Sequence, residues 1–441
     1  MTRREAQQHR YFRHVQQNSA RVLHLATTLA YSEMVSDLVR SFREVCEYRK
    51  YDVTYQCSLL LSVILIGLLS GENDIKSIEA FVKNNPDKVN EYLKAAGEET
   101  LPGNPSDSTL LRSLHNVNYL DLLAVVAEWS YKYASTPYLR HIAIDGKALR
   151  ACLKKCFGGT HPPYILNAFD VKNGVVHSQI EINSKTNEIG NFYDLLKLMK
   201  LDGAFITGDA AFSTARAMKA VVDAGGHMAC PIKDNQQLLE QSIGTFIDEM
   251  SVNTENCVIR YEDPENGQSS HGRIYWRTYE LISEGVDELL AGTDFEGIGH
   301  SVARVHRVRQ DILYDDKHHI ICNPEEKTSQ TVMYILDTAN VTVEQFARFV
   351  RDHWAGCEII HYVLDTEFDE DQSRIITGYG MQNMALLRKA CITILKSIKN
   401  RVKRMSFHTI RITLRDLGGI PADEVSTDSS SLDQPDTDMT G

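Results

Sequence analysis

Apolar and polar residues follow a helical spacing through the first third of the chain. Residues 41 to 134 carry apolar side chains at i, i+3 and i+4, which predicts an all-helical N-terminal domain over 41–136. The most apolar run, 58–69, is shorter than the roughly 20 residues that span a bilayer, so we expect a buried helix and no membrane contact. Residues 1–40 are expected to form an N-terminal extension.

After Pro137 the pattern changes to short apolar or alternating runs, which are typical of strands. A strand, a hairpin, a helix, a strand, a helix and a further strand follow one another, and this order predicts a mixed α/β layer. We assign 137–251 to the first part of a catalytic core. The expected strands are 142–145, 164–169, 175–182, 204–207 and 227–232, and the expected helices are 191–199 and 214–224.

The rest of the chain falls into three parts. Residues 252–340 alternate loop-forming residues with apolar runs and predict a β-rich insertion. Helical spacing resumes at Val343, so 341–420 is expected to be a helical C-terminal part of the core that includes a basic segment. Residues 421–441 are rich in Ser, Thr and Asp and are expected to form a disordered acidic tail.

Composition narrows the class of protein. With 43% hydrophobic and 24% charged residues, the 441-residue chain is typical of a folded globular protein. The nine cysteines are scattered without zinc-ligand spacing, which favours reduced thiols in a cytoplasmic protein. The first 21 residues lack the apolar stretch of a signal peptide, so secretion is not expected.

The net charge of -12 hides an uneven distribution. Between Arg388 and Arg415 there are nine Lys or Arg residues and no acidic residue, whereas the chain after Pro421 holds acids and no base. Because salt screens charges over roughly 10 Å, local patches decide whether a phosphate backbone is attracted. The overall negative charge therefore does not exclude DNA as a partner.

Two aspartates stand out, because each ends an expected strand. Asp145 follows 142–144 and precedes Gly146, and Asp209 follows 204–207. If the two strands are neighbours, their carboxylates repel one another unless a divalent cation lies between them, and oxygen ligands of this kind suit Mg²⁺ or Mn²⁺. The alternative is that both are ordinary turn residues.

Several motifs resemble, in order and spacing, the H-repeat-associated family of DDE transposases. They are Asp-Gly-Lys-x-Leu-Arg at 145–150, Ser-Lys-Thr-Asn-Glu-Ile at 184–189, Thr-Gly-Asp-Ala at 207–210 and Lys-Asp-Asn-Gln at 233–236. His-Trp at 353–354, His-Tyr-Val-Leu-Asp at 361–365, Phe-x-Glu-Asp at 368–371 and Leu-Leu-Arg at 386–388 extend the match. The resemblance covers roughly 41–400.

The resemblance implies an RNase H-like core in which two aspartates, here Asp145 and Asp209, and a later helical glutamate hold two Mg²⁺ or Mn²⁺ ions. It implies cleavage of double-stranded DNA at transposon ends, followed by transfer of the freed 3′-hydroxyl to target DNA. Since two ends must be joined, a homodimer is expected. A bacterial, cytoplasmic and nucleoid-associated setting also follows from the resemblance alone.

The third carboxylate departs from the family pattern. The position that corresponds to the family's glutamate is Cys357, and Glu358 comes one residue later, which is a rotation of about 100° on a helix. Either a local helix irregularity brings Glu358 to the site, or the third ligand is lost. We assign Glu358 as the expected catalytic and metal-binding residue.

Basic residues in and beyond these motifs are candidates for DNA contacts. Lys147 and Arg150 follow Asp145 closely, and Arg273 and Arg277 share one face of an expected strand with tyrosines, a pattern that suits phosphate contact and base stacking. Solvated turns and faces are the alternative for each. The remaining candidates are Lys185, Lys233, Lys399, Arg401, Lys403 and Arg404.

The sequence therefore predicts a DNA transposase of the DDE type. Two rival interpretations keep the same fold. One is a catalytically impaired, DNA-binding relative, which Cys357 at the glutamate position would favour. The other is a metal-dependent nuclease without strand transfer, which fold alone does not distinguish from a transposase.

Overall fold

The computed structural model describes most of the chain between residues 29 and 417. The described residues are 29–133, 140–149, 162–170, 172–182, 188–233, 236–253, 257–270, 273–311, 313–314, 320–321, 328–401 and 405–417. The expected acidic tail lies outside them, as do the side chains of residues 354–359.

The N-terminal part is helical, as the sequence predicts, and α2 crosses the boundary that was expected at residue 40. The apolar helix α3 is buried on all sides, which explains a run without a polar face. Ser106 caps α6 by accepting from the Thr109 backbone N–H at 3.3 Å. The elements are α2 (Leu29–Ser41), η1 (Phe42–Glu44), α3 (Cys57–Leu69), α4 (Ile75–Asn84), α5 (Pro86–Ala95), α6 (Asp107–Asn116) and α7 (Tyr119–Tyr133).

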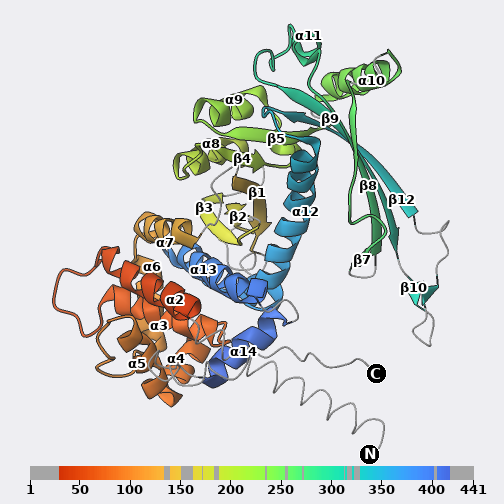
Figure 1. Ribbon diagram of the computed structural model, residues 1–441. Helices are drawn as coiled ribbons and strands as arrows, with labels where there is room; N and C mark the ends of the chain where they lie inside the picture. Colours follow the sequence, from red (N-terminus) through yellow and green to blue (C-terminus); the bar gives the residue numbers. More distant parts are fainter. Residues whose placement is uncertain are drawn as a thin grey trace, which may run out of the picture.

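A mixed sheet forms the centre of the molecule (Figure 1). Its first five strands lie in the order β3-β2-β1-β4-β5, with β1, β4 and β5 parallel and β2 antiparallel to its neighbours. The mixed α/β class expected for an RNase H-like core is thereby confirmed. The elements are β1 (Arg140–Ala148), β2 (Tyr164–Asp170), β3 (Val175–Ile182), α8 (Glu188–Lys197), β4 (Ala204–Thr207), η4 (Ala210–Phe212), α9 (Ala215–Asp223), β5 (His227–Ile232) and α10 (Gln237–Asn253).

The β-rich segment continues this sheet rather than standing apart from it. Strand β12 pairs antiparallel with β5, and β9, β8 and β6 follow in turn, which gives a sheet of ten described strands with β7 at its side. Figure 1 shows the long strands β8, β9 and β12 projecting from the core. The elements are β6 (Ile259–Glu262), β7 (Ser269–Ser270), β8 (Arg273–Ile282), α11 (Val286–Leu290), β9 (Ser301–Asp311), β10 (Leu313–Tyr314), β11 (Ile320–Ile321) and β12 (Thr328–Asp337).

Helices cover both faces of the sheet. On one face, Ile142 and Ile144 of β1 pack in one core with Phe192 of α8 and Met218 of α9. On the other, Phe205 of β4 packs in a core with Phe349 of α12. This division follows from the alternation of side chains along a strand. Odd-numbered residues of β1, Asp145 included, therefore lie on the face that α12 covers.

The C-terminal helices connect the sheet with the N-terminal helices. α12 begins at Val343, as predicted, and Thr342 and Gln345 form a capping box at its start. α13 shares one hydrophobic core with α3, α6 and α7, because Leu386, Leu387 and Leu395 are buried among their side chains. The elements are α12 (Val343–Thr366), η6 (Glu370–Gln372), α13 (Gly380–Arg401) and α14 (Phe407–Leu417).

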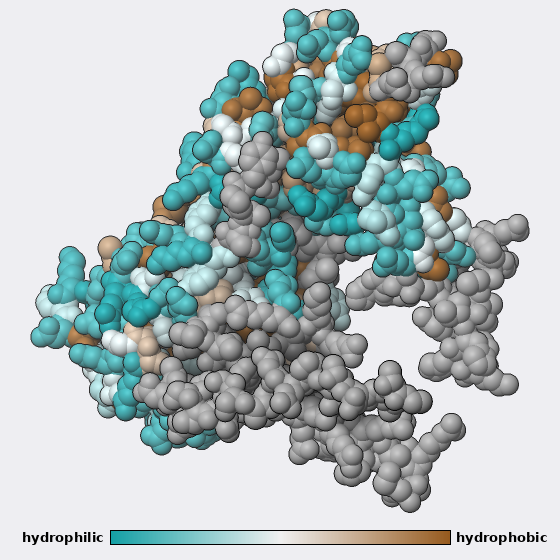
Figure 2. Space-filling view, in the orientation of Figure 1, coloured by the Kyte–Doolittle hydropathy of each residue, from teal (hydrophilic) through white to brown (hydrophobic). Residues whose placement is uncertain are grey.

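The surface is mainly hydrophilic on the face that Figure 2 shows, and hydrophobic residues gather near α10 and β9. Exposed apolar side chains there include Leu238 and Val252 of α10. None of the described helices has the length and apolarity that a bilayer span requires.

Candidate active site

Asp145 lies inside strand β1, and the expectation that it ends a strand is wrong. β2 pairs antiparallel with β1 as far as Ala148, and Asp145 stands directly opposite Asn167. This ladder carries the strand through Asp145 and Gly146, so the pair does not form a turn. The Asp145 carboxylate accepts a hydrogen bond from the Gly146 N–H at 2.9 Å.

Asp145 and Asp209 nevertheless lie at the same level of neighbouring parallel strands. Ala143 of β1 pairs with Thr207 of β4, and each aspartate comes two residues after its member of this pair. The backbone at Asp209 is still extended, although β4 has ended, and its carboxylate accepts from the Ala211 N–H at 2.8 Å. Because neighbouring strands are about 4.8 Å apart, this register brings the backbone of the two aspartates to the same level of the sheet.

His361 of α12 lies beside Asp145. Its Nδ1 is 3.7 Å from the Asp145 Oδ2. Burial, with the positive charge of Lys147, lowers the pKa of His361 to about 4, so the ring is neutral at pH 7. Its buried Nε2 has no hydrogen-bond partner among the described residues. In the sequence, His361 appears only as part of the motif at 361–365, and its contact with Asp145 depends on how α12 crosses the sheet.

A chain of buried hydrogen bonds joins the two acid-bearing strands to α12. The hydroxyl of Thr207 on β4 lies 2.7 Å from Nε2 of His141 on β1 and 2.9 Å from Nδ1 of His353 on α12. All three side chains are buried. Burial lowers the pKa of His353 to about 4, so its ring stays neutral.

Lys147 is the clearest correction to the expected DNA contacts. Its side chain is only 7% exposed, and its Nζ lies 2.9 Å from the Glu370 carboxylate and 3.7 Å from that of Asp371. It also donates to Asp365 of α12. Burial alone would lower the pKa of Lys147, but Glu370 and Asp365 raise it, so the ammonium stays charged inside the protein. A buried, paired ammonium is not available to a phosphate.

A second buried lysine lies in the same region. Lys389 of α13 donates to Asn167 at 2.6 Å and also to Gln179. Burial lowers its pKa to about 8. Since Asn167 stands opposite both Asp145 and Gln179, a row of polar side chains runs from the aspartate across β2 to β3 and ends at this lysine. In the sequence, Lys389 is one of nine bases in a basic run.

The residues present suit a divalent cation in part. Two carboxylates at the same level of adjacent strands supply the oxygen ligands that Mg²⁺ and Mn²⁺ prefer. Among the described side chains, no group of three His, Cys, Asp or Glu residues lies close enough to hold a metal ion. Glu358, the expected third ligand, is one of the residues whose side chain is outside this set. Its role stays a prediction.

Helix α12 is continuous from Val343 to Thr366. The irregularity that could have shifted the register near Glu358 is therefore absent from its backbone. On a regular helix, Cys357 lies between the directions of His353 and His361, and Glu358 is rotated by about 100° from Cys357.

The other expected DNA-binding residues differ in how exposed they are and in what they contact. Lys233 follows β5 and is exposed, whereas Arg150 and Lys185 lie outside the described residues. Arg273 pairs with Asp311 at 3.5 Å and remains half exposed. The Arg277 guanidinium lies over the Tyr275 ring, 4.8 Å from its centroid, and Arg307 of β9 approaches the same ring at 5.8 Å.

Several bases of the run between 388 and 415 are buried rather than exposed to a partner. Arg388, Lys389 and Arg411 are buried, and Arg411 donates to the Leu68 carbonyl at 2.7 Å. Lys399 is half buried and donates to the Met405 carbonyl at 2.8 Å. Arg411 thus joins α14 to the end of α3, and Lys389 joins α13 to strands β2 and β3. The side chain of Arg401, and Lys403 and Arg404, lie outside the described residues.

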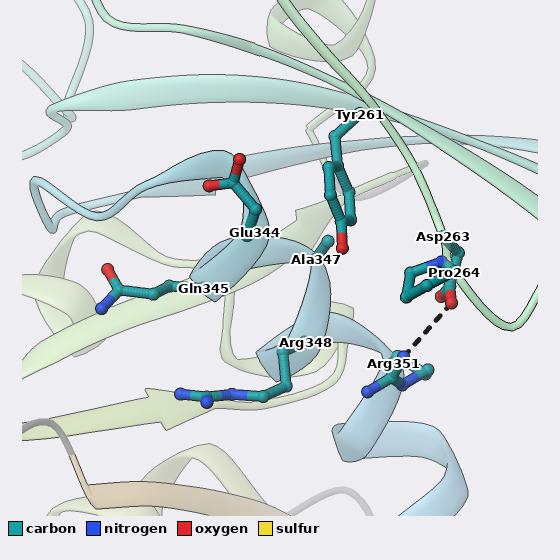
Figure 3. Close-up of a pocket in the computed structure, with 8 residues that line it drawn as sticks. All are labelled: Tyr261, Asp263, Pro264, Glu344, Gln345, Ala347, Arg348 and Arg351. Carbon is teal, nitrogen blue, oxygen red and sulfur yellow. Dashed lines mark hydrogen bonds and ion pairs between the residues drawn. The ribbon is translucent and has the colours of Figure 1, made fainter.

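A small cavity of about 260 Å³ lies beside α12 but away from the aspartates (Figure 3). Asp263 is buried at its edge, 3.2 Å from the Arg351 guanidinium and 3.9 Å from that of Arg277. Neither Asp145 nor Asp209 lines it, so we interpret it as packing space where α12 meets the loop after β6. Its lining residues are Tyr261, Asp263, Pro264, Glu344, Gln345, Ala347, Arg348 and Arg351.

Comparison with known proteins identifies the family of the chain. Residues 138–394 match the family described as the transposase DDE domain, and residues 39–130 match a family described as associated with it. The chain is 26% identical over 359 residues to "Putative transposase YncI" of Escherichia coli O157:H7, covering 80% of this chain and 86% of the relative. It is 26% identical over 356 residues to "H repeat-associated putative transposase YhhI" of Escherichia coli strain K12, covering 80% and 88%.

A solved structure of a piggyBac transposase synaptic complex with hairpin DNA shares 9% identity over 90% of this chain and 79% of that chain, with a TM-score of 0.39. This likeness is too low to establish a common fold. The family match, in contrast, covers more than half of the chain and includes both aspartates. The resemblance that the sequence motifs indicated is thereby confirmed, and the chain belongs to the transposase DDE domain family.

Proposed function

We propose that the protein is a DDE-type DNA transposase that binds transposon-end DNA and catalyses metal-dependent cleavage and strand transfer. The observation that supports this proposal is the register of β1 and β4, because Asp145 and Asp209 each follow the last pair, Ala143 and Thr207, by two residues. Family membership supports the reaction class.

Asp145, Asp209 and Glu358 are the proposed ligands of two Mg²⁺ or Mn²⁺ ions, and on the continuous helix α12 Glu358 would have to reach the site from a direction about 100° away from that of Cys357. When bound, such ions lower the pKa of an attacking water or 3′-hydroxyl and stabilise charge on the leaving oxygen. The chain's own part is to hold the carboxylates at adjacent strands and to keep a neutral His361 beside Asp145. The buried neutral ring excludes water from that side of the carboxylate and adds no positive charge that would compete with a cation.

The DNA contacts are proposed for the part of the sheet that extends beyond α12. Arg277, Tyr275 and Arg307 form a basic and aromatic group on paired strands β8 and β9. Odd-numbered residues of β8 and β9 lie on the same face of the sheet as Tyr279 and Val305. Tyr279 and Val305 pack against α12 in the same core as Phe205 of β4. Guanidinium groups suit phosphate and an aromatic ring suits a base, so this face would lead double-stranded DNA toward the aspartates.

Arg150, Lys185, Lys233, Arg273, Lys399, Arg401, Lys403 and Arg404 complete the proposed DNA-binding set. A homodimer is proposed because two transposon ends must be joined, and the exposed apolar residues of α10 supply surface that association would bury. A cytoplasmic, nucleoid-associated location follows from the DNA substrate. Sedimentation with and without DNA would measure the oligomeric state.

The test uses the full chain and duplexes copied from the DNA that flanks its own gene. In Mg²⁺ or Mn²⁺, the wild-type protein should nick these duplexes and join the 3′ ends to a plasmid. Asp145→Asn and Asp209→Asn should each lower nicking at least 100-fold, since losing a ligand removes about 3 kcal/mol or more of transition-state stabilisation. Asp223→Asn is the matched control, because Asp223 is an exposed residue of α9 that pairs only with Lys219 in the same helix.

Nicking without joining would identify a nuclease rather than a transposase. Binding of the duplexes with no nicking would identify the catalytically impaired relative. The continuous helix at Cys357 is the observation that favours this second function, because the backbone does not bring Glu358 into the family's register.

A further inference from the structure

Helix α12 is tied to β1 at two points by buried polar groups. The threonine clamp consists of His141, Thr207 and His353. The lysine clamp consists of Lys147, Asp365 and Glu370. The first joins the helix at residue 353 and the second at residue 365, on either side of His361, which lies beside Asp145.

The threonine clamp connects three elements through one hydroxyl group. A threonine hydroxyl has a single proton, so Thr207 donates to one imidazole nitrogen and accepts from the other. β1, β4 and α12 each supply one member, and each member is buried. A buried polar group that loses its partner costs about 1–3 kcal/mol, so removal of the hydroxyl leaves two imidazole nitrogens to be satisfied.

The clamp is also held from its sides by aromatic packing. The His141 ring lies 5.0 Å from the Phe349 ring of α12, and Phe349 stacks on Phe205 of β4 at 4.4 Å. The apolar contacts press the helix onto the sheet without fixing how far it slides or turns. The hydrogen bonds through Thr207 fix the translation and rotation of α12, because a hydrogen bond weakens steeply when its distance or angle changes.

The lysine clamp fixes the position of α12 near the C-terminal end of the helix. Glu370 is 2% exposed and lies 2.9 Å from Lys147 Nζ, and Asp365 approaches the ammonium from the last turns of α12. Asp371 also lies 3.7 Å from the ammonium, so three carboxylates surround one buried cation, and moving Lys147 away from them would leave buried negative charge without its nearest partner. The clamp therefore fixes both the end of α12 and the turn that contains η6 against β1.

The spacing of the two clamps matches along helix and strand. From residue 353 to residue 365 a helix rises about 18 Å, and from residue 141 to residue 147 a strand extends about 20 Å. The helix and β1 therefore cover similar distances between the two clamps. The helix residues between the clamps lie along the part of β1 that contains Asp145.

We propose that Thr207 and Lys147 are positioning residues that fix the translation and rotation of α12 relative to the two aspartates. Neither touches the reacting atoms. Each acts through α12, which carries His361 and residues 357 and 358. The catalytic consequence rests on the proposed function, whereas the effect on the helix itself does not.

The first experiment is hydrogen exchange on the full chain, followed by mass spectrometry. Thr207→Val keeps the shape of the side chain and removes the hydroxyl. It should lower the protection of peptides from 343–366 by about tenfold while peptides from α9 keep theirs, because loss of the Thr207 hydrogen bonds opens α12 locally. Thr207→Ser, which restores the hydroxyl, should restore protection.

The matched control is Thr413→Val. Thr413 is a buried residue of α14 whose hydroxyl donates only to the Thr409 carbonyl of the same helix, at 2.7 Å. It should leave the exchange of 343–366 unchanged. The proposal is overturned if Thr207→Val leaves α12 as protected as in the wild type, or if protection falls equally in α9, since that result describes ordinary destabilisation.

The second experiment measures Mn²⁺ affinity by calorimetry and nicking by the full chain. Thr207→Val should weaken Mn²⁺ binding about tenfold and lower kcat with little change in KM for the DNA, and Thr207→Ser should recover both. Unchanged affinity and kcat in Thr207→Val would overturn the positioning role. If the wild-type protein neither binds Mn²⁺ nor nicks DNA, the proposed function fails, and the exchange experiment still decides whether the clamps set α12.

Lys147 is tested in the same exchange experiment. Lys147→Met should lower the protection of 343–366 by more than that of α9, because the lost ion pair lies at the end of α12 while the loss of overall stability affects both segments. Lys147→Arg, which keeps the charge, should recover part of the protection. Lys219→Met removes an exposed ammonium of α9 and serves as control. Full protection of 343–366 in Lys147→Met would exclude Lys147 from the clamp.

Discussion

Lys147 of β1 and Glu370 of η6 form an ion pair of 2.9 Å in the interior of the protein, with 7% and 2% of their side chains exposed. The pair joins the strand that carries Asp145 to the turn after α12. Lys147, two residues after Asp145, thus joins two segments of the candidate site in the protein interior. The sequence pattern predicted that it would contact DNA.

Breaking this pair should strongly destabilise the fold. Lys147→Met removes the ammonium that lies 2.9 Å from the Glu370 carboxylate, while the charges of Lys389 and Arg388 still act on that carboxylate, and loss of one partner of a buried ion pair costs up to about 3–5 kcal/mol. Urea unfolding of the two proteins measures the difference. Lys219→Met, which breaks an exposed pair, should change the free energy of unfolding by less than about 1 kcal/mol. A similar small change in Lys147→Met would contradict the buried pair.

The identity of the third carboxylate can be decided by two substitutions on α12. If Glu358 is a ligand, Glu358→Gln should lower metal-dependent nicking at least 100-fold, and Cys357→Ser should leave it nearly unchanged. If the third ligand has been lost, the wild-type protein should be inactive and Cys357→Glu should introduce nicking. Activity that survives both Glu358→Gln and Cys357→Ser would show that neither position takes part.

The proposed DNA contacts of β8 and β9 should appear in the salt dependence of binding. Each phosphate contact adds about 0.9 to the slope of log affinity against log salt, so Arg277→Gln with Arg307→Gln should make the slope shallower by nearly two. Lys219→Gln on α9 is the control. An unchanged slope in the double variant would exclude these arginines as phosphate contacts.

Stability should fall in mild acid because of His177 of β3. Its side chain is fully buried, and burial lowers its pKa to about 3, with the charge of Arg140 as a smaller cause. The unfolded chain, with a histidine pKa of about 6.5, binds the proton first, so the stability that is complete above pH 6.5 is lost as the pH falls toward 3. Between pH 7 and pH 5 this residue should remove about 2 kcal/mol.

Unfolding of His177→Leu at both pH values measures this contribution, and the variant should show a smaller loss of stability on acidification. His300→Gln changes an exposed histidine and should keep the wild-type pH dependence. Equal acid sensitivity in His177→Leu and the wild type would mean that His177 is not the residue responsible.

Local sequence patterns determined much of the architecture. The helical N-terminal part, the start of α12 at Val343 and the end of β4 at Thr207 follow from apolar spacing, capping residues and strand length, which act between near neighbours in the chain. The family, too, could be read from motifs in their order. For the same reason, Asp145 and Asp209 could be paired in advance as residues of neighbouring strands.

Only the tertiary structure decided what surrounds these residues. The sequence pattern of Asp145 and Gly146 predicts a turn, but in the folded protein β2 pairs with this part of β1. The pattern of Lys147, Lys389 and Arg411 is that of exposed bases, but carboxylates, amides and carbonyls from distant segments enclose them. A charged residue has the same local pattern whether its partner is water or a buried carboxylate 223 positions away, as Glu370 is from Lys147. The difference lies in desolvation and pairing, which exist only once the chain has folded.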